Sequence, residues 1–198
     1  MRPEQTPRKN LSLIPATPVL LPQGAITEIS GAVSTGRTAV LHSILAEATQ
    51  AEECCAMVDS LGSFDPLSAA QAGVKLQRLL WVRTSVLPGK HTPLEGAIKA
   101  TDLILHSGGF GVVILDLCEV SNRELNTIPL SYWYRFRRAI ENTPTRLVVT
   151  SHVPLAKACA RLSLVTYRKQ VAWKGSTPLF RGIEFEVETR KQRVALAS

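Results

Sequence analysis

Long hydrophobic runs are missing from this sequence of 198 residues. No stretch of about eighteen consecutive apolar residues occurs, and a helix needs roughly that length to cross a bilayer. The apolar stretch 11–21 follows a basic start, but Pro15 and Pro18 interrupt it and no small-residue cleavage site follows. We therefore expect neither a transmembrane helix nor a signal peptide, and we interpret residues 1–20 as a partly mobile leader segment that lies on the domain.

Closely spaced cysteine pairs are also missing. The sequence has four cysteines, at positions 54, 55, 118 and 159, and no C-x-x-C pair among them. Cys54 and Cys118 stand in apolar runs, which favours buried thiols in a reducing cytoplasm. His42, His91 and His106 are scattered without the spacing of metal ligands, so we expect ordinary surface or helix residues at these positions.

Internal repeats and low-complexity linkers are absent too, and a composition of 45% hydrophobic and 20% charged residues is ordinary for a globular protein. We therefore predict a single domain over residues 21–198. The net charge of +7 is unevenly distributed, since residues 1–100 have 9 Lys and Arg against 8 Asp and Glu, and residues 101–198 have 14 against 8. A basic second half indicates either an acidic partner, such as nucleic acid or an acidic protein surface, or a solvated basic surface.

The stretch Gly31–Thr38 reads Gly-Ala-Val-Ser-Thr-Gly-Arg-Thr. It fits the phosphate-binding pattern G-x-x-x-x-G-K-[ST] at every fixed position except Arg37, which replaces lysine. An alternating strand (25–29) precedes the loop and an amphipathic helix (39–48) follows it. In this context the loop amides and the helix N-terminus converge on one anion, although a chance glycine turn before a helix is the simpler alternative. The residues expected to bind nucleotide phosphates are Gly31, Ser34, Thr35, Gly36, Arg37 and Thr38.

Strands and helices alternate along the rest of the chain. Strands are predicted at 54–59, 79–82, 111–116 and 147–150, and helices at 66–72, 92–105 and 130–140. The run 111–116 has no polar alternation, which is typical of a strand buried on both faces of a parallel sheet. The segments 162–173 and 180–188 are extended instead, and the second alternates apolar residues with glutamates. The prediction is a doubly wound α/β fold, with a mostly parallel twisted sheet flanked by helices and a C-terminal antiparallel hairpin.

A magnesium site is expected beside the loop. In phosphate-loop proteins Mg²⁺ is held by the loop Ser or Thr and by an Asp that ends a neighbouring apolar strand. Thr38 and Asp116 fit these roles. We therefore expect the strands 25–29 and 112–116 to lie side by side in one sheet, with Thr38 close to Asp116. The alternative is that Asp116 only caps the end of the sheet.

Hydrolysis would also require a group that positions and activates water. The loop 59–65, which follows the second strand, contains no Glu or Gln and offers only Asp59 and Asp65. Asp59 ends the strand, and Asp65 precedes a proline, where a turn-forming role is common. Arg37 adds a second difference, because a guanidinium is larger and more planar than a lysine ammonium. We therefore do not expect fast turnover.

With both motifs placed, residues 21–195 resemble the ATPase core of the bacterial recombinase RecA. The resembling segments are 21–38, 57–80, 113–116 and 188–195. The resemblance implies a RecA-like phosphate-loop NTPase core with ATP and Mg²⁺ as cofactors, and it adds Asp65 to the nucleotide-binding residues. It also places Lys191 and Arg193 where basic residues of the recombinase reach the ATP of a neighbouring subunit.

The sequence departs from the recombinase at four places. The resemblance puts Leu61 at the catalytic glutamate, Ser68 at the adenine-stacking tyrosine, and Ser151 and His152 at the Asn-Gln pair that senses the γ-phosphate. The long glycine-rich loop that binds DNA is shortened to 153–160. These departures imply that the chain does not form a strand-exchange filament.

This trimmed pattern is similar to the ImuA-type accessory proteins of the bacterial mutagenesis complex, in size, in the segment 128–135 and in the basic tail. The resemblance implies a cytoplasmic protein, nucleoid-associated when DNA is damaged, that assists translesion synthesis in the SOS response. It implies as partners an inactive Y-family polymerase homologue and an error-prone replicative polymerase, together with RecA and single-stranded DNA.

Basic side chains are the candidates for DNA or partner contacts, because phosphates are bound by Lys and Arg. The candidates are Arg135, Arg137, Arg138, Arg168, Lys169 and Lys174. Two other functions remain open from the sequence. One is a working ATPase of the recombinase or clock-protein type, in which Asp59 or His152 assists water. The other is a RecA-fold inhibitor of cell division.

Overall fold

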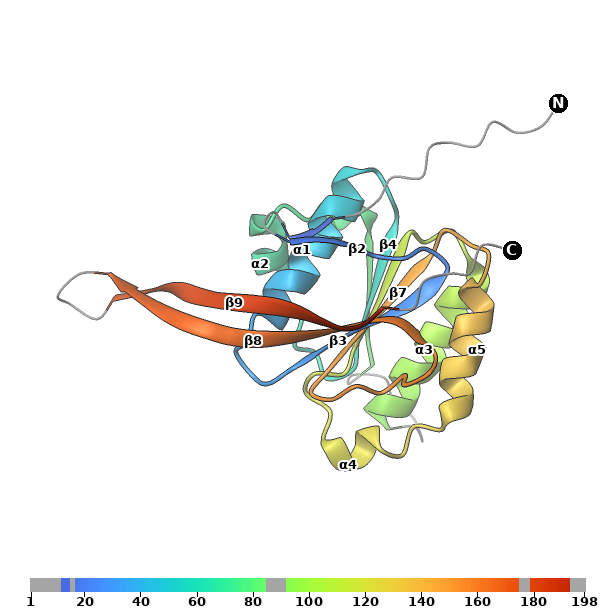
Figure 1. Ribbon diagram of the computed structural model, residues 1–198. Coiled ribbons are helices and arrows are strands. Elements are labelled where there is room, and N and C mark those ends of the chain that lie inside the picture. Colours follow the sequence, from blue (N-terminus) through green and yellow to red (C-terminus); the bar gives the residue numbers. More distant parts are fainter. Residues whose placement is uncertain (1–11, 15–16, 85–91, 175–178, 193–198) are drawn as a thin grey trace.

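The computed structural model describes residues 12–14, 17–84, 92–174 and 179–192, and Figure 1 shows their arrangement. A seven-stranded sheet forms the centre, with strands in the order β5-β4-β6-β7-β3-β8-β9. In that order the strands are Leu79–Arg83, Cys55–Asp59, Val112–Asp116, Arg146–Ser151, Ala25–Gly31, Ala160–Lys174 and Leu179–Gln192. The first six run parallel to their neighbours, and β9 runs antiparallel to β8. The predicted fold class is confirmed, including the antiparallel hairpin at the end.

Helices cover both faces of the sheet, which explains why every residue of β4, β6 and β7 is buried. Helix α1 (Arg37–Gln50) packs on one face in a core with Ile29, Met57 and Ile114. Helices α3 (Pro93–Ser107) and α5 (Leu130–Ile140) pack on the other face in a second core. The two cores fix the positions of the strand ends, where the phosphate loop lies.

Local sequence signals explain where these helices begin. Thr92 Oγ1 accepts a hydrogen bond from the Glu95 amide at 3.2 Å, and the Glu95 carboxylate accepts one from the Thr92 amide at 3.1 Å. This capping box, with Pro93 in the first turn, starts α3 as the sequence predicts. The same pattern at Ser121 and Glu124 starts the short helix α4 (Asn122–Leu125), which we did not predict.

Other short elements were also not predicted. Strands β1 (Ser12–Ile14) and β2 (Thr17–Leu20) form a small antiparallel hairpin, and β1 lies beside α1. The 3₁₀ helix η1 (Leu76–Arg78) leads into β5. Residues 1–11 of the expected leader segment lie outside the described residues.

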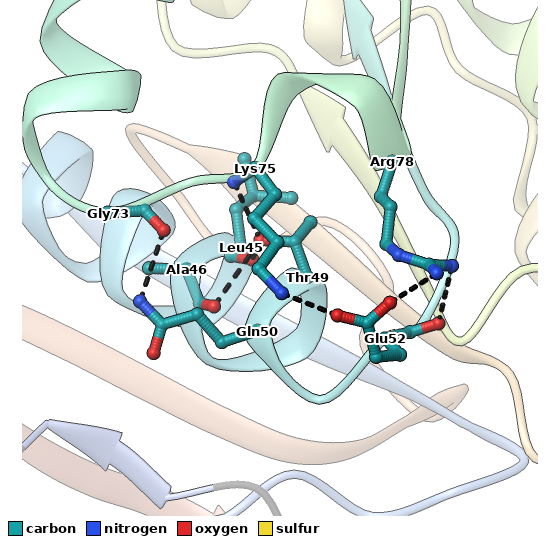
Figure 2. Close-up of polar contacts among 8 residues, drawn as sticks. All are labelled: Leu45, Ala46, Thr49, Gln50, Glu52, Gly73, Lys75 and Arg78. Atoms are coloured by element: carbon teal, nitrogen blue, oxygen red, sulfur yellow. Dashed lines mark hydrogen bonds and ion pairs between the residues drawn. The ribbon is translucent and has the colours of Figure 1, made fainter.

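An ionic cluster attaches the η1 segment to the end of α1 (Figure 2). The Glu52 carboxylate pairs with both Lys75 and Arg78, and Arg78 also donates to the Glu52 carbonyl at 2.8 Å. The Lys75 amide donates to Thr49 Oγ1 at 3.1 Å. The hydrogen bond from Lys75 and the charges of both cations hold the pKa of Glu52 below its usual value. The cluster therefore fixes the outer strand β5 relative to α1.

One expectation about the sheet is wrong. Strands β3 and β6 belong to the same sheet, but they are not neighbours, because β7 pairs with both and lies between them. All three run parallel, so their carboxyl ends still meet at one edge of the sheet. The expected position of Thr38 near Asp116 therefore does not depend on direct pairing of the two strands.

The C-terminal hairpin extends beyond the sheet. Strand β3 pairs with β8 only as far as Gly31, opposite Thr166, while β8 continues to residue 174. Beyond Thr166, β8 and β9 continue as a two-stranded ribbon that projects from the body (Figure 1). At about 3.3 Å per residue, residues 167–174 of β8 span roughly 25 Å. Within the described part of the chain, no helix combines the length and the apolar character that crossing a membrane requires.

Candidate functional site

The phosphate loop joins the end of β3 to the start of α1. The chain turns through left-handed conformations at Ser34 (φ 60°) and Gly36 (φ 89°), and Gly36 is the N-cap of the helix. Thr35 Oγ1 donates to the Ala32 carbonyl at 2.8 Å and lies 2.7 Å from Thr166 Oγ1 on β8. These contacts fix the loop against the neighbouring strand.

Gly31 is required where the loop leaves β3. A Cβ atom at this position would lie 2.2 Å from Thr166 Oγ1 and 2.7 Å from Thr35 Oγ1. Both distances are far shorter than van der Waals contact. Any other residue would therefore displace the loop from β8, because the two threonine hydroxyls occupy the space.

Helix α1 begins without a side-chain cap. The first amides of a helix have no partner within the helix, and together with the helix dipole they favour an anion. A loop with left-handed turns before such an uncapped start is therefore suited to a phosphate group. Thr38 lies in this first turn and is exposed.

Thr38 and Asp116 line the same pocket, which has a volume of about 180 Å³. Asp116 Oδ1 accepts hydrogen bonds from Thr150 Oγ1 at 2.7 Å and from the Cys118 amide at 3.0 Å. Its Oδ2 accepts a longer bond from Ser63 Oγ at 3.4 Å. A hydroxyl and an oriented carboxylate beside an open helix start are the donor set that Mg²⁺ with a phosphate requires, so the residues fit this group. The other residues that line the pocket are Arg37, Leu41, His42, Met57, Ser63, Phe64, Cys118 and Glu119.

Arg37 is turned across the pocket towards the end of β7. Its side chain is buried, with an exposed fraction of 7%, and Nη1 lies 3.4 Å from Nδ1 of His152. A guanidinium has no acceptor, so the imidazole nitrogen must accept this bond. The contact joins a loop residue to a residue 115 positions later in the chain, directly after β7.

Asp59 is committed to the structure of its own loop. Its carboxylate is 1% exposed. It accepts hydrogen bonds from the amides of Gly62 at 2.7 Å, Ser63 at 3.0 Å and Phe64 at 3.0 Å, and from Trp81 Nε1 at 3.3 Å. With four donors the two oxygens are already used, so Asp59 is an anchor for the loop.

Asp65 is an N-cap and does not line the pocket. It accepts from the amides of Leu67 and Ser68 at 3.1 Å and from Ser68 Oγ at 2.5 Å, at the start of α2 (Pro66–Gln71). The hydrogen bonds from Ser68 hold the pKa of this exposed carboxyl below its usual value. Asp65, which the resemblance adds to the nucleotide-binding residues, is thus bonded to Ser68, which the resemblance puts at the adenine-stacking tyrosine.

His42 was expected to be an ordinary surface or helix residue, and it is a helix residue, in α1. His42 lines the pocket and is 8% exposed. It follows Thr38 by four residues, so the two side chains lie on the same side of α1. That spacing was available in the sequence, but the contact with the Phe64 ring, which comes from a separate loop, was not.

The cysteines divide between buried and exposed positions. Cys118 is buried as expected, but Cys54 is exposed, contrary to expectation, because it precedes β4 and lies outside the sheet. Cys55 and Cys159 are also buried.

The predicted basic residues lie in two separate places (Figure 1). Arg137 and Arg138 are exposed on α5, where Arg137 lies 5.8 Å from the ring centre of Tyr134. Arg135 is held by Asp102 of α3 through two bonds, at 2.7 and 2.6 Å. Arg168 and Lys169 are exposed on the ribbon. The side chains of Lys174 and Lys191, and all of Arg193, lie outside the described residues.

Comparisons with known proteins agree with this architecture. The sequence profile of the RecA N-terminal domain family matches residues 10–125. The chain is 33% identical over 96 residues to Protein RecA of Ectopseudomonas oleovorans, an alignment that covers 48% of this chain and 26% of that protein. It is 32% identical over 96 residues to Protein RecA of Laribacter hongkongensis, covering 48% and 25%. The aligned region therefore spans about a quarter of these curated relatives. The crystal structure of the RadB recombinase superposes with a TM-score of 0.55 at 14% identity, covering 74% of this chain and 76% of that one.

Proposed function

Because the chain belongs to the RecA N-terminal domain family, we propose that it is a RecA-like accessory protein that binds nucleotide without hydrolysing it and acts through partners. One observation carries this proposal. The resemblance puts Leu61 at the family's catalytic glutamate, and this side chain is 42% exposed and has no acidic or amide group. The carboxylates of Asp59 and Asp65, in the same described loop, are both occupied by other donors. The loop therefore offers no group to activate water.

The phosphate site itself supports binding of ATP with Mg²⁺. The amides at the start of α1 and the loop would hold the phosphates, and Thr38 and Asp116 would hold the metal ion, which would neutralise phosphate charge. Arg37 would contribute a positive charge from its position near His152. These groups bind and orient a nucleotide, and none of them withdraws a proton from water.

Substitutions at Leu61 and Asp116 test this proposal. Isothermal titration with ATP and Mg²⁺ is expected to give binding by the wild type, and weaker binding by Asp116→Asn. Phosphate release by the wild type should not exceed that of Asp116→Asn. Leu61→Glu should raise release, because its exposed side chain can be exchanged without disturbing a core, and Leu61→Gln serves as the matched control without a base. Binding that is absent in the wild type contradicts the nucleotide part of the proposal.

We further propose that the partners are those of translesion synthesis, namely an inactive Y-family polymerase homologue and an error-prone replicative polymerase. The support is the resemblance of segment 128–135 to ImuA-type proteins, together with the exposed Leu130 and Tyr134 on α5. Exposed aromatic and aliphatic side chains with neighbouring arginines are typical of interface centres. Loss of the gene should lower mutation frequency after DNA damage. Tyr134→Asp should reproduce that loss and weaken binding to the purified polymerase homologue, whereas Leu67→Asp, at an exposed position of α2, is the control.

DNA contact would use the exposed basic residues. Arg168 and Lys169 on the ribbon, and Arg137 and Arg138 on α5, are candidates, whereas Arg135 is paired with Asp102. Binding to a single-stranded oligonucleotide, measured by fluorescence anisotropy, should weaken as salt increases, because each neutralised phosphate releases counterions. Replacing both basic residues of one pair by glutamate, first on the ribbon and then on α5, identifies which of the two surfaces binds the oligonucleotide. Affinity that is unchanged by salt excludes this contribution.

A slow ATPase is the second candidate, because Thr38 and Asp116 share one pocket. If this second candidate is correct, the wild type releases phosphate from ATP and the Asp116→Asn variant does not. The sequence candidates for its water-activating group are both engaged, since Asp59 anchors its loop and His152 accepts from Arg37.

A further inference from the structure

Thr150 of β7 lies directly opposite Asp116 of β6, at the edge of the sheet that carries the phosphate site. Two residues earlier on the same strands, Ile114 and Val148 pack in the core with α1. Side chains alternate between the two faces of a sheet, so Asp116 and Thr150 also lie on the face that α1 covers. Thr150 has an exposed fraction of 0%, so it can influence a ligand of the pocket only through Asp116.

The backbone around Asp116 is held from both neighbouring strands. Ser60, which follows β4, donates to the Asp116 carbonyl through its hydroxyl at 2.8 Å and through its amide at 3.4 Å. On the other side, the Leu117 amide donates to the Thr150 carbonyl at 2.9 Å. The end of β6 is therefore fixed in place, and what remains to be set is the rotation of the carboxylate.

The two oxygens of the Asp116 carboxylate have different surroundings. Oδ1 accepts hydrogen bonds from Thr150 Oγ1 at 2.7 Å and from the Cys118 amide at 3.0 Å. Oδ2 accepts a longer bond, from Ser63 Oγ at 3.4 Å, which is at the outer limit for a hydroxyl donor. The two short bonds to Oδ1 set the rotation of the carboxylate, and they leave Oδ2 as the oxygen that a cation can use.

This arrangement favours one kind of cation. Mg²⁺ in nucleotide sites binds one or two carboxylates together with phosphates, and it keeps several waters in a strict octahedral shell. Ca²⁺ is larger, takes roughly six to eight oxygen ligands, and often binds both oxygens of one carboxylate. Because Oδ1 of Asp116 is already engaged by two donors, the carboxylate suits a contact through one oxygen, as Mg²⁺ makes, and opposes the contact through two oxygens that Ca²⁺ can make.

We propose that Thr150 is a positioning residue for the metal ion of this site. Its hydroxyl holds Oδ1 of Asp116, so that Mg²⁺ binds through Oδ2 alone and the site selects Mg²⁺ over Ca²⁺. The inference rests on the proposed function, because it concerns the metal ion that accompanies a bound nucleotide. It assigns the selection of the metal to a residue of β7 that touches neither the phosphate nor the ion.

The test is isothermal titration with ATP in the presence of Mg²⁺, of Ca²⁺, or of EDTA. Thr150→Val keeps a similar side-chain shape and removes the hydroxyl. Loss of a hydrogen bond to a metal-binding carboxylate lowers metal affinity by roughly 10–100-fold, so the gain in ATP affinity that Mg²⁺ provides should fall at least about ten-fold. ATP affinity in EDTA should be unchanged. The preference for Mg²⁺ over Ca²⁺ should also fall, because Ca²⁺ can then reach both oxygens of Asp116.

Two variants serve as controls. Thr150→Ser restores a hydroxyl at the same position and should keep the wild-type response to both ions. Thr101→Val is the matched control for the loss of a buried threonine hydroxyl, because Thr101 is also 0% exposed and donates within α3, to the Ala97 carbonyl at 2.8 Å. A merely structural effect would lower the stability of Thr101→Val and leave its responses to Mg²⁺ and Ca²⁺ as in the wild type.

The outcomes separate this inference from the proposed function. If Thr150→Val keeps the wild-type gain from Mg²⁺ and the wild-type preference over Ca²⁺, the inference alone is overturned. Hydrolysis that depends on Asp116 overturns the proposed function, while the loss of the Mg²⁺ gain in Thr150→Val still supports the inference. Absence of ATP binding by the wild type overturns both. If circular dichroism shows that Thr150→Val is unfolded, the wild type decides, since tighter ATP binding with Mg²⁺ than with Ca²⁺ supports the inference and equal binding overturns it.

Discussion

Replacing Asp59 by asparagine tests whether this carboxylate is an anchor. Each of its oxygens accepts two hydrogen bonds, Oδ1 from the Gly62 and Ser63 amides and Oδ2 from the Phe64 amide and Trp81 Nε1. Asparagine retains one oxygen and presents an NH₂ group in place of the other. Two buried donors then face another donor, and at roughly 1–3 kcal/mol for each unsatisfied group we expect a loss of about 4 kcal/mol. That is a large part of the free energy of unfolding of a typical domain.

The assay is urea denaturation of wild type and Asp59→Asn, followed by tryptophan fluorescence and circular dichroism. Asp65→Asn is the matched control, because Asp65 is an exposed helix cap and asparagine caps a helix about as well as aspartate, so stability should change by less than about 1 kcal/mol. If Asp59→Asn unfolds within about 1 kcal/mol of the wild type, the carboxylate is not holding the loop. Asp59 would then return as a candidate for activating water, and the reasoning for a non-hydrolysing site would lose its basis.

Three further predictions concern buried groups. Because burial lowers the pKa of His42, the unfolded chain takes up a proton at higher pH than the folded protein, so stability should decrease as pH falls below about 6.5. Urea denaturation at pH 7.5 and 5.5 should show a smaller decrease for His42→Leu, and an identical decrease in both proteins contradicts this. Glu28→Ala should lower the free energy of unfolding by about 3 kcal/mol in the same assay, because Glu28 accepts hydrogen bonds from the buried amides of Leu155, at 2.5 Å, and Ala156. A change below about 1 kcal/mol would show that the Glu28 carboxylate does not hold these two residues. Iodoacetamide should label the exposed Cys54 in the native protein and spare Cys55, whose pKa burial raises to about 12, as mass spectrometry can establish. Rapid labelling of both would show that β4 is open to solvent.

The sequence was sufficient for the elements whose signals are local. Gly31 and Gly36 with the flanking periodicities located β3, the loop and α1, and the capping box at Thr92 located α3. The lack of alternation in β6 correctly predicted burial on both faces of a parallel sheet. These features depend on residues close together in the chain, so the sequence pattern contains the information that determines them.

Features that join distant segments could not be predicted in this way. Strand β7 lies between β3 and β6 although it follows both in the chain, since the order of a sheet depends on how its crossovers pack. The contact between Arg37 and His152 joins residues 115 positions apart. His42 and Phe64 meet in the wall of the pocket only in the folded chain, and Asp59 becomes an anchor only because its loop folds back on it. The candidate site was therefore located by the sequence, while the roles of several of its residues were not.

The central claim is that this chain retains a phosphate site and lacks the group that hydrolyses its ligand. A single-turnover experiment with radiolabelled ATP and Mg²⁺, with the protein in excess, tests it most directly. We predict that nucleotide is bound, and that phosphate is released no faster by the wild type than by Asp116→Asn. Phosphate release by the wild type that Asp116→Asn abolishes would contradict the account.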